Sequence, residues 1–68
     1  MISYQPFWDT IQKKGITTYT LIKEYKLSKS LIDKLKHNKG LNTSTLNELC
    51  RILDCKLSDI AVYKPDEE

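Results

Sequence analysis

Lysine residues are concentrated in the first forty positions of this chain, and their side chains could bind a polyanion. Residues 1–40 contain eight lysines and three acidic residues, a net charge of +5, whereas residues 41–68 carry a net charge of −3. Because ammonium groups attract phosphate, this asymmetry favours one face for nucleic acid and another face turned away from it. The alternative is an unevenly charged, solvated surface that has no partner.

Two cysteines and one histidine are the candidate metal ligands. Cys50 and Cys55 lie five positions apart, and only His37 could join them. A structural zinc site needs four ligands at characteristic spacings, so we expect no metal. Cys50 lies on an apolar helical stripe and is expected to be a small core residue. We expect no disulfide between the two cysteines in a reducing compartment.

No pattern typical of catalysis is present. The carboxylates are scattered, no glycine-rich phosphate loop occurs, and 68 residues leave little room for an enclosed cleft. We therefore expect neither enzymatic activity nor a cofactor. The composition, with 40% hydrophobic and 29% charged residues, is typical of one small folded domain. Apolar runs are too short for a membrane span or a signal peptide, so we expect a cytoplasmic location and no membrane partner.

The lysines must be positioned by helices, because apolar side chains recur at spacings of three and four. The first such stripe predicts a helix that begins near Pro6 and ends with Lys13, Lys14 and the stop residue Gly15. Its apolar members are expected to anchor the core, with an aromatic ligand pocket as the alternative. They are Tyr4, Phe7, Trp8 and Ile11.

Residues 17–38 predict two further helices joined by a tight turn. The helical period breaks at Lys26–Leu27, between helices expected at about Thr18–Tyr25 and Lys29–His37. Thr17 and Ser28 each precede one of these helices and are suited to cap it. Two helices joined in this way form a helix-turn-helix, whose second helix has one face in the core and one free for a DNA groove.

The remaining residues predict two more helical segments and no strand. A turn at residues 38–40 precedes a fourth helix, which carries Leu46, Leu49, Cys50 and Leu53 and ends near Asp54. A last turn or two, capped by Ser58, is expected to run through Ile60 to Tyr63. Ile60, with Val62 or Tyr63, should close the core. The predicted fold is therefore all-α, with five short helices in a domain of residues 1–64 and an acidic tail at residues 65–68.

The stretch from Thr17 to Asn38 resembles the helix-turn-helix of the phage-repressor and Cro family, the XRE-type regulators. The similarity continues through Leu46, Leu49 and Leu53 to residues 57–60, so it covers most of the chain. It implies a lambda-repressor-like DNA-binding domain. The matching positions of the motif are Thr17, Thr18, Leu21, Ile22, Lys26, Leu27, Ser28, Ile32, Lys36 and Asn38.

Five positions depart from the family pattern. Lys26 replaces the glycine of the turn, where a left-handed backbone would cost about 1 kcal/mol relative to glycine. Asn38 replaces the closing glycine and tolerates the same conformation. Ile22 replaces a small alanine and should push the two helices slightly apart. Thr18 stands in place of glutamine, and Lys36 in place of glutamate.

The resemblance also implies which residues contact DNA. Family members place the start of the second motif helix in the major groove, which puts Lys29, Ser30, Asp33 and Lys34 at base edges. A lysine could donate to guanine, whereas Asp33 could accept from cytosine or pair instead with Lys29. Lys23 and Lys36 are expected to be solvated, and His37 could cap the helix end rather than contact phosphate. Candidates for backbone contacts are Thr17, Thr18, Ser28, His37, Lys39 and Asn42.

Together these features predict a small transcriptional regulator, most simply a repressor, that binds double-stranded DNA. The resemblance implies a homodimer through Ile52–Tyr63, expected to be weak or assembled on DNA, and no small-molecule effector is evident. The alternative is an interaction module of antitoxin or adaptor type. The missing glutamine and the outward Asp33 favour that alternative, and the clustered positive charge counts against it.

Overall fold

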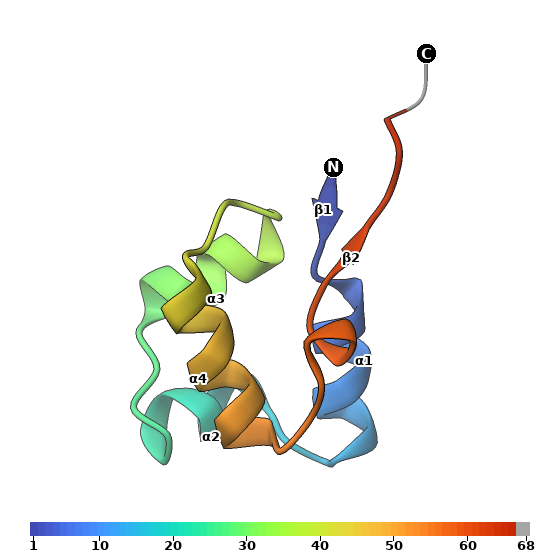
Figure 1. Cartoon of the computed structure of the whole chain (residues 1–68). Coiled ribbons are helices and arrows are strands. Elements are labelled where there is room, and N and C mark those ends of the chain that lie inside the picture. The colour runs from blue at the N-terminus through green and yellow to red at the C-terminus, as the bar shows by residue number, and fades with distance from the viewer. Residues whose placement is uncertain (67–68) are drawn as a thin grey trace.

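Successive α-helices form the middle of the chain, and a short strand lies near each end. In the computed structural model, which describes residues 1–66, the helices are α1 (Gln5–Lys13), α2 (Thr18–Lys23), α3 (Lys29–Lys36) and α4 (Thr43–Leu53). A single 3₁₀ turn, η1 (Leu57–Asp59), follows them. The strands are β1 (Ile2–Ser3) and β2 (Val62–Tyr63) (Figure 1). The predicted order of the first four helices is confirmed, although α2 ends two residues earlier than Tyr25.

Side-chain caps fix where three of the helices begin. The Thr17 hydroxyl accepts from the Thr20 amide at 3.2 Å, and the Ser28 hydroxyl accepts from the Leu31 amide at 3.0 Å. The Asn42 carboxamide oxygen accepts from the Thr45 amide at 2.8 Å. Each bond satisfies one of the amides that a helix start leaves without a partner. The predicted caps at Thr17 and Ser28 are confirmed.

Left-handed residues fix where the helices stop. Gly15 has a φ of 69° after α1, as expected for a glycine stop. Lys26 has a φ of 62° and Asn38 a φ of 54°, so both positions keep the backbone for which the family uses glycine. The predicted left-handed turn at Lys26 is confirmed.

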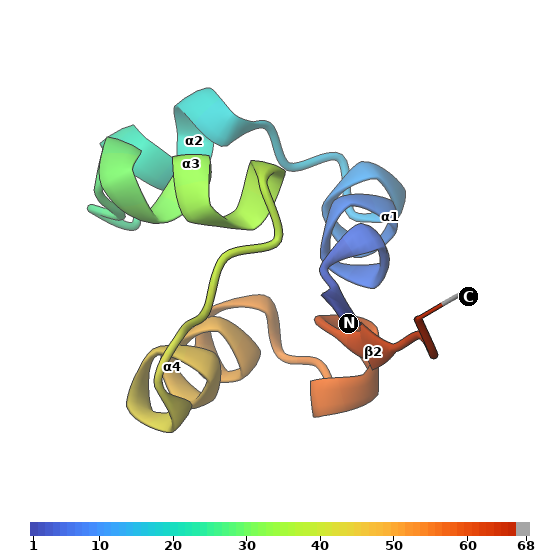
Figure 2. The ribbon, with the colours of Figure 1, turned by 90° about the horizontal axis from the view of Figure 1, so that it is seen from above.

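The core lies where the helical stripes meet. Figure 2 shows α1, the α2–α3 pair and α4 arranged around it. The Trp8 ring is half-buried and meets the Phe7 ring edge-on, with centroids 4.9 Å apart, so the predicted aromatic anchors do pack in the core. The buried apolar residues are Tyr4, Phe7, Ile11, Leu21, Ile32, Leu35, Leu49, Leu53 and Ile60.

The ends of the chain differ from the prediction. β1 pairs antiparallel with β2, with Ile2 opposite Tyr63, so the expectation of no strand was wrong. Two-residue strands are too short to show alternation. The predicted fifth helix over residues 58–63 is instead the 3₁₀ turn η1, because the chain enters β2 at Val62, only three residues after the turn ends. The all-α helix-turn-helix class nevertheless holds.

Burial at the end of the chain follows from this pairing. Ile60 is fully buried, as predicted, but Val62 and Tyr63 are 42% and 64% exposed. The expectation that one of those two closes the core was therefore wrong, because β2 holds them at the surface. Of the predicted acidic tail, Glu67 and Glu68 lie outside the described residues.

Tyr4 ties the start of the chain to the end of α3. Its amide donates to Asn38 Oδ1 at 2.9 Å, and its phenol donates to the Lys39 carbonyl at 2.7 Å. Burial raises the pKa of the Tyr4 phenol, which keeps it a hydrogen donor. A glycine at position 38 would allow the same backbone but could not accept from Tyr4.

Candidate nucleic-acid interface

The turn between α2 and α3 holds the two helices in a fixed relation. Leu21 from α2 and Leu35 from α3 are both fully buried. The Leu27 amide, just after the left-handed Lys26, donates to the Leu21 carbonyl at 3.1 Å and closes the turn. The Ser28 cap then starts α3 at once. The orientation of α3 is thus set by the core on one side and by the turn at its start.

The outward face of α3 gathers the residues predicted to contact bases. Lys29, Ser30, Asp33 and Lys34 are all exposed. They lie opposite the buried Ile32 and Leu35, as the helical period requires. Three hydrogen-bonding side-chain types on one solvent-facing helix surface can donate to and accept from base edges.

A shallow depression of about 280 Å³ borders this face on the side of α2. It brings Thr18, one of the predicted backbone contacts, beside Lys29 and Asp33. Lys36, which the sequence pattern led us to treat as merely solvated, lines the same depression. Ile22 and Ile32 also line it, so the bulky Ile22 lies between α2 and α3.

A second depression, of about 390 Å³, borders the other side of the α3 face. It brings Ser28, Ser30 and Lys34 together with Asn42 at the start of α4. Thr45 also lines it and was missed by the sequence reasoning. The sequence could have indicated Thr45, because it lies in the first turn of α4, three residues after the cap Asn42.

The Asp33 carboxylate pairs with His37 rather than with Lys29. His37 Nδ1 lies 3.3 Å from Asp33 Oδ1 and 3.0 Å from the Asp33 carbonyl oxygen. The His37 backbone amide donates to the same carbonyl at 3.1 Å. His37 therefore caps the end of α3, which was the alternative that the sequence offered to a phosphate contact. Among the described residues, the ion pair between Asp33 and Lys29, which the sequence offered as an alternative to base contact, is not formed.

Thr17 and Lys39, which were also predicted to contact the DNA backbone, lie outside both depressions. Thr17 precedes α2, and its hydroxyl contacts the Thr20 hydroxyl at 3.1 Å in addition to capping the helix. Lys39 lies in the turn after α3, where its carbonyl accepts from Tyr4. Both side chains are exposed.

The comparisons with known proteins decide the family. A family model for the Cro/C1-type HTH DNA-binding domain matches residues 7–66. The chain belongs to this family. The predicted resemblance to the phage repressors and Cro is thereby confirmed. As a Cro/C1-type domain, the chain uses α2 and α3 as its helix-turn-helix.

A solved structure shows the same fold. The crystal structure of the transcriptional regulator VanUg (form II) superposes with a TM-score of 0.84 at 26% sequence identity. The match covers 96% of this chain and 87% of that one. No curated protein matches the sequence. The Cro/C1-type domain found in the sequence is thus also found in the arrangement of its helices.

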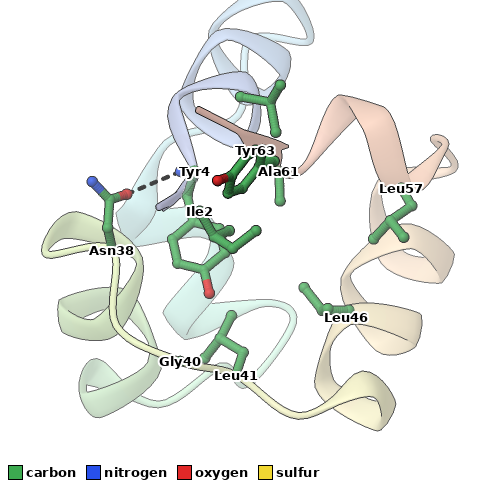
Figure 3. Close-up of a pocket in the computed structure, with 10 residues that line it drawn as sticks. Ile2, Tyr4, Asn38, Gly40, Leu41, Leu46, Leu57, Ala61 and Tyr63 are labelled. Carbon is green, nitrogen blue, oxygen red and sulfur yellow. Dashed lines mark hydrogen bonds between the residues drawn. The ribbon is translucent and has the colours of Figure 1, made fainter. Parts of the chain in front are cut away.

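An apolar groove of about 450 Å³ lies on another side of this Cro/C1-type domain. Figure 3 shows its side chains coming from β1, the loop before α4, α4, η1 and the region of β2. None of its lining residues is charged. Gly40 and Leu41 line both this groove and the polar depression beside Lys34, so the two surfaces are neighbours. The lining residues are Ile2, Tyr4, Asn38, Gly40, Leu41, Leu46, Leu57, Ala61, Val62 and Tyr63.

The cysteines lie away from the outward face of α3. Cys50 and Cys55 are both free and half-buried, and burial, together with the neighbouring Cys50, raises the pKa of the Cys55 thiol. Within residues 1–66, no three His, Cys, Asp or Glu side chains are grouped as metal ligands would be. No helix in the same range is long and apolar enough to cross a lipid bilayer.

Proposed function

We propose that this Cro/C1-type domain binds specific double-stranded DNA as a small transcriptional regulator, with α3 in the major groove. The observation that carries the proposal is the outward face of α3. It presents Lys29, Ser30, Asp33 and Lys34 to solvent, between two shallow depressions. The similar fold of VanUg, a transcriptional regulator, supports the same function.

Each side chain on this face would have a distinct role. Lys29 and Lys34 would donate to guanine O6 or N7, an interaction worth about 1–3 kcal/mol of discrimination when well aligned. Asp33 would accept from a cytosine amino group and repel phosphate, so it would reject sequences rather than add affinity. Ser30 is short and can donate or accept.

The two flanks would fix the position of the domain on the DNA backbone. The depression beside α2 offers Thr18 and Lys36, and Thr17 lies just before α2. The depression beside α4 offers Ser28, Asn42 and Thr45. Contacts of this kind set register without distinguishing bases. Lys39 lies beyond the end of α3 and would bind a phosphate there.

The experiment is binding to random duplex DNA across a salt series, with wild type beside Lys29→Ala/Lys34→Ala. We expect affinity to fall steeply with salt. The slope of log K against log salt should drop by about 0.9 for each phosphate that the variant no longer neutralises. The matched control is Lys14→Ala/Lys56→Ala, which removes the same charge. Lys14 lies near Cys55, which is two residues beyond the end of α4.

The comparison of the two double variants is decisive. If both weaken binding equally, only net charge matters and the assignment of α3 fails. If wild type does not bind at low salt, the proposal of DNA binding itself fails. Selection of bound sequences from a random pool then tests specificity, which Asp33→Ala should relax.

We further propose that a second copy of the chain occupies the apolar groove. One α3 contacts only one half-site, and half-sites lie about 34–36 Å apart on the duplex. The groove adjoins the polar depression beside Lys34 at Gly40 and Leu41, so a copy seated there would lie next to the surface that we propose for DNA. Of the predicted dimer segment, Ile60 is fully buried and cannot take part, whereas Leu57, Val62 and Tyr63 are exposed.

The regulatory outcome that we propose is repression. A dimer that covers two half-sites would occupy a promoter and block access to it. A promoter fused to a reporter and carrying the selected sequence should lose expression when the chain is produced. Increased expression would reverse this part of the proposal and leave DNA binding intact.

A further inference from the structure

The two cysteines stand on either side of the turn that ends α4. The Cys55 amide donates to the Cys50 carbonyl at 3.1 Å, and the Asp54 amide donates to the Arg51 carbonyl at 3.4 Å. Asp54 is left-handed, with a φ of 52°. These two hydrogen bonds around a left-handed residue define a Schellman turn. In such a turn the side chains at the positions of Cys50 and Cys55 commonly contact each other.

α1 ends in the same kind of turn, with apolar side chains at the equivalent positions. The Ile16 amide donates to the Ile11 carbonyl at 2.8 Å, across the left-handed Gly15. Ile11 is buried, and Ile16 packs against the same core. The turn after α4 therefore places two thiols where the turn after α1 places two isoleucines.

The thiols are neighbours as well as the backbones. Both cysteines are free and half-buried. Burial is the main cause that raises the pKa of the Cys55 thiol, and Cys50 raises it further through its charge and through a side-chain hydrogen bond. The two sulfur atoms are thus close enough to interact directly. The backbone turn and this interaction place a dithiol at the end of α4.

One of the two thiols borders an open depression. Cys50 lines a hollow of about 240 Å³ between α4 and η1, and Cys55 is not among its lining residues. A small molecule in solvent can therefore approach Cys50 first. The lining residues are Thr43, Leu46, Asn47, Cys50 and Leu57.

We propose that Cys50 and Cys55 form a modification site at which a hydroperoxide, such as hydrogen peroxide, produces a reversible disulfide within the chain. The Cys50 thiolate attacks one peroxide oxygen and the O–O bond breaks. Cys50 becomes a sulfenic acid, and the departing hydroxide takes up the proton of the thiol to give water. The Cys55 sulfur then attacks the sulfenic sulfur, the S–O bond breaks, and the hydroxyl leaves with the Cys55 proton as a second water. Two thiols are oxidised, and one peroxide is reduced to two waters.

The disulfide would join the end of α4 to the segment that leads into η1. Leu46 on α4 and Leu57 on η1 line both the depression at Cys50 and the apolar groove. The modification therefore stiffens one wall of the groove and leaves the outward face of α3 unchanged. In a reducing compartment the chain stays in the dithiol form, and a dithiol reductant reverses the modification by exchange. The inference goes beyond the proposed function, since none of its steps involves DNA.

The test treats the reduced, folded chain with hydrogen peroxide and measures its intact mass and its free thiols. We expect each chain to lose two hydrogen atoms and both thiols, and dithiothreitol to restore them. Peptide mapping should locate the bond between Cys50 and Cys55. The melting temperature of the oxidised chain should rise by about 5 °C or more, because the cross-link restricts the unfolded state. Cys50→Ala/Cys55→Ala, which keeps Met1 and Trp8 as other oxidisable groups, should show no such rise.

The single variants separate the roles of the two thiols. Cys55→Ser has no second thiol, so peroxide should leave Cys50 as a sulfenic acid that dimedone labels. Cys50→Ser should be labelled several-fold more slowly, because Cys55 does not line the depression. Equal labelling of the two variants would overturn the assignment of Cys50 as the first thiol to react. In wild type, a disulfide between two chains, or a sulfinic acid at Cys50 with Cys55 still free, would overturn the proposed site.

Discussion

The outward face of α3 and the apolar groove are built in opposite ways. The α3 face comes from one continuous helix, and its residues lie together because of the helical period. The groove comes from five separate parts of the chain, from Ile2 to Tyr63. The first is polar and charged, whereas the second contains no charged residue. A surface made locally can change in sequence without refolding, but the groove exists only when the whole domain has assembled.

The largest expected effect removes the support of α3. Leu35→Ala leaves a cavity beneath the outward face, because Leu35 is fully buried, and it should cost about 2–5 kcal/mol in the free energy of unfolding. Thermal denaturation measures this decrease. The control Leu57→Ala alters a side chain that is 56% exposed and should stay within about 0.5 kcal/mol. Equal melting temperatures for the two variants would mean that the stability of α3 does not depend on Leu35.

The next effect separates the two surfaces. Leu57→Ser/Tyr63→Ser makes the groove polar and should weaken association of two copies, because less apolar surface is buried. On DNA with two half-sites we expect affinity to fall about tenfold, which corresponds to about 1.4 kcal/mol. Binding to a single half-site should not change.

Sedimentation of the same variant checks that prediction directly. Wild type should form a dimer on two half-sites, and the variant should bind there as independent monomers. A wild-type chain that stays monomeric both free and at saturation on DNA would remove the role of the groove.

A smaller effect should touch only the α3 face. Ser28→Ala removes the acceptor for the Leu31 amide and should cost about 1 kcal/mol. Fraying at the start of α3 would loosen Lys29 and Ser30, so DNA affinity should fall several-fold while association through the groove stays the same. Ser58→Ala, at an exposed serine outside α3, is the matched control. Weaker DNA binding in both variants would count against the importance of this helix start.

The smallest effect compares two left-handed residues. Lys26→Gly relieves an unfavourable backbone and should raise stability by up to about 1 kcal/mol. Asn38→Gly relieves a similar backbone but removes the acceptor for the Tyr4 amide, so it should lower stability by about 1 kcal/mol. Chemical denaturation measures both. A stabilising Asn38→Gly would show that the link to Tyr4 contributes little.

The features predicted from the sequence are those determined by near neighbours. The caps at Thr17 and Ser28, the left-handed Lys26 and the outward positions of Lys29 and Lys34 each depend on residues within one or two helical turns. Such features follow from the helical period and from the preferences of single residues. They include the predicted base-contacting set, whose interactions with DNA stay a prediction.

The features missed depend on residues far apart in the chain. β1 and β2 are two residues each and exist only because opposite ends of the chain meet. Thr45 borders the α3 face through the packing of α4, and Lys36 shares a depression with Thr18 through the packing of α2 against α3. The bond from Tyr4 to Asn38 joins positions 34 apart. None of these interactions leaves a local pattern in the sequence.

The pairing of the two chain ends has a consequence for the order of folding. The Lys64 amide donates to the Met1 carbonyl at 2.8 Å, and these residues are 63 positions apart. Closing such a long loop costs entropy that only an already assembled set of helices can offset. The sheet should therefore form last and open first, with α2 and α3 intact on both occasions. A newly made chain would acquire its helix-turn-helix before it acquires the surface for pairing with another copy.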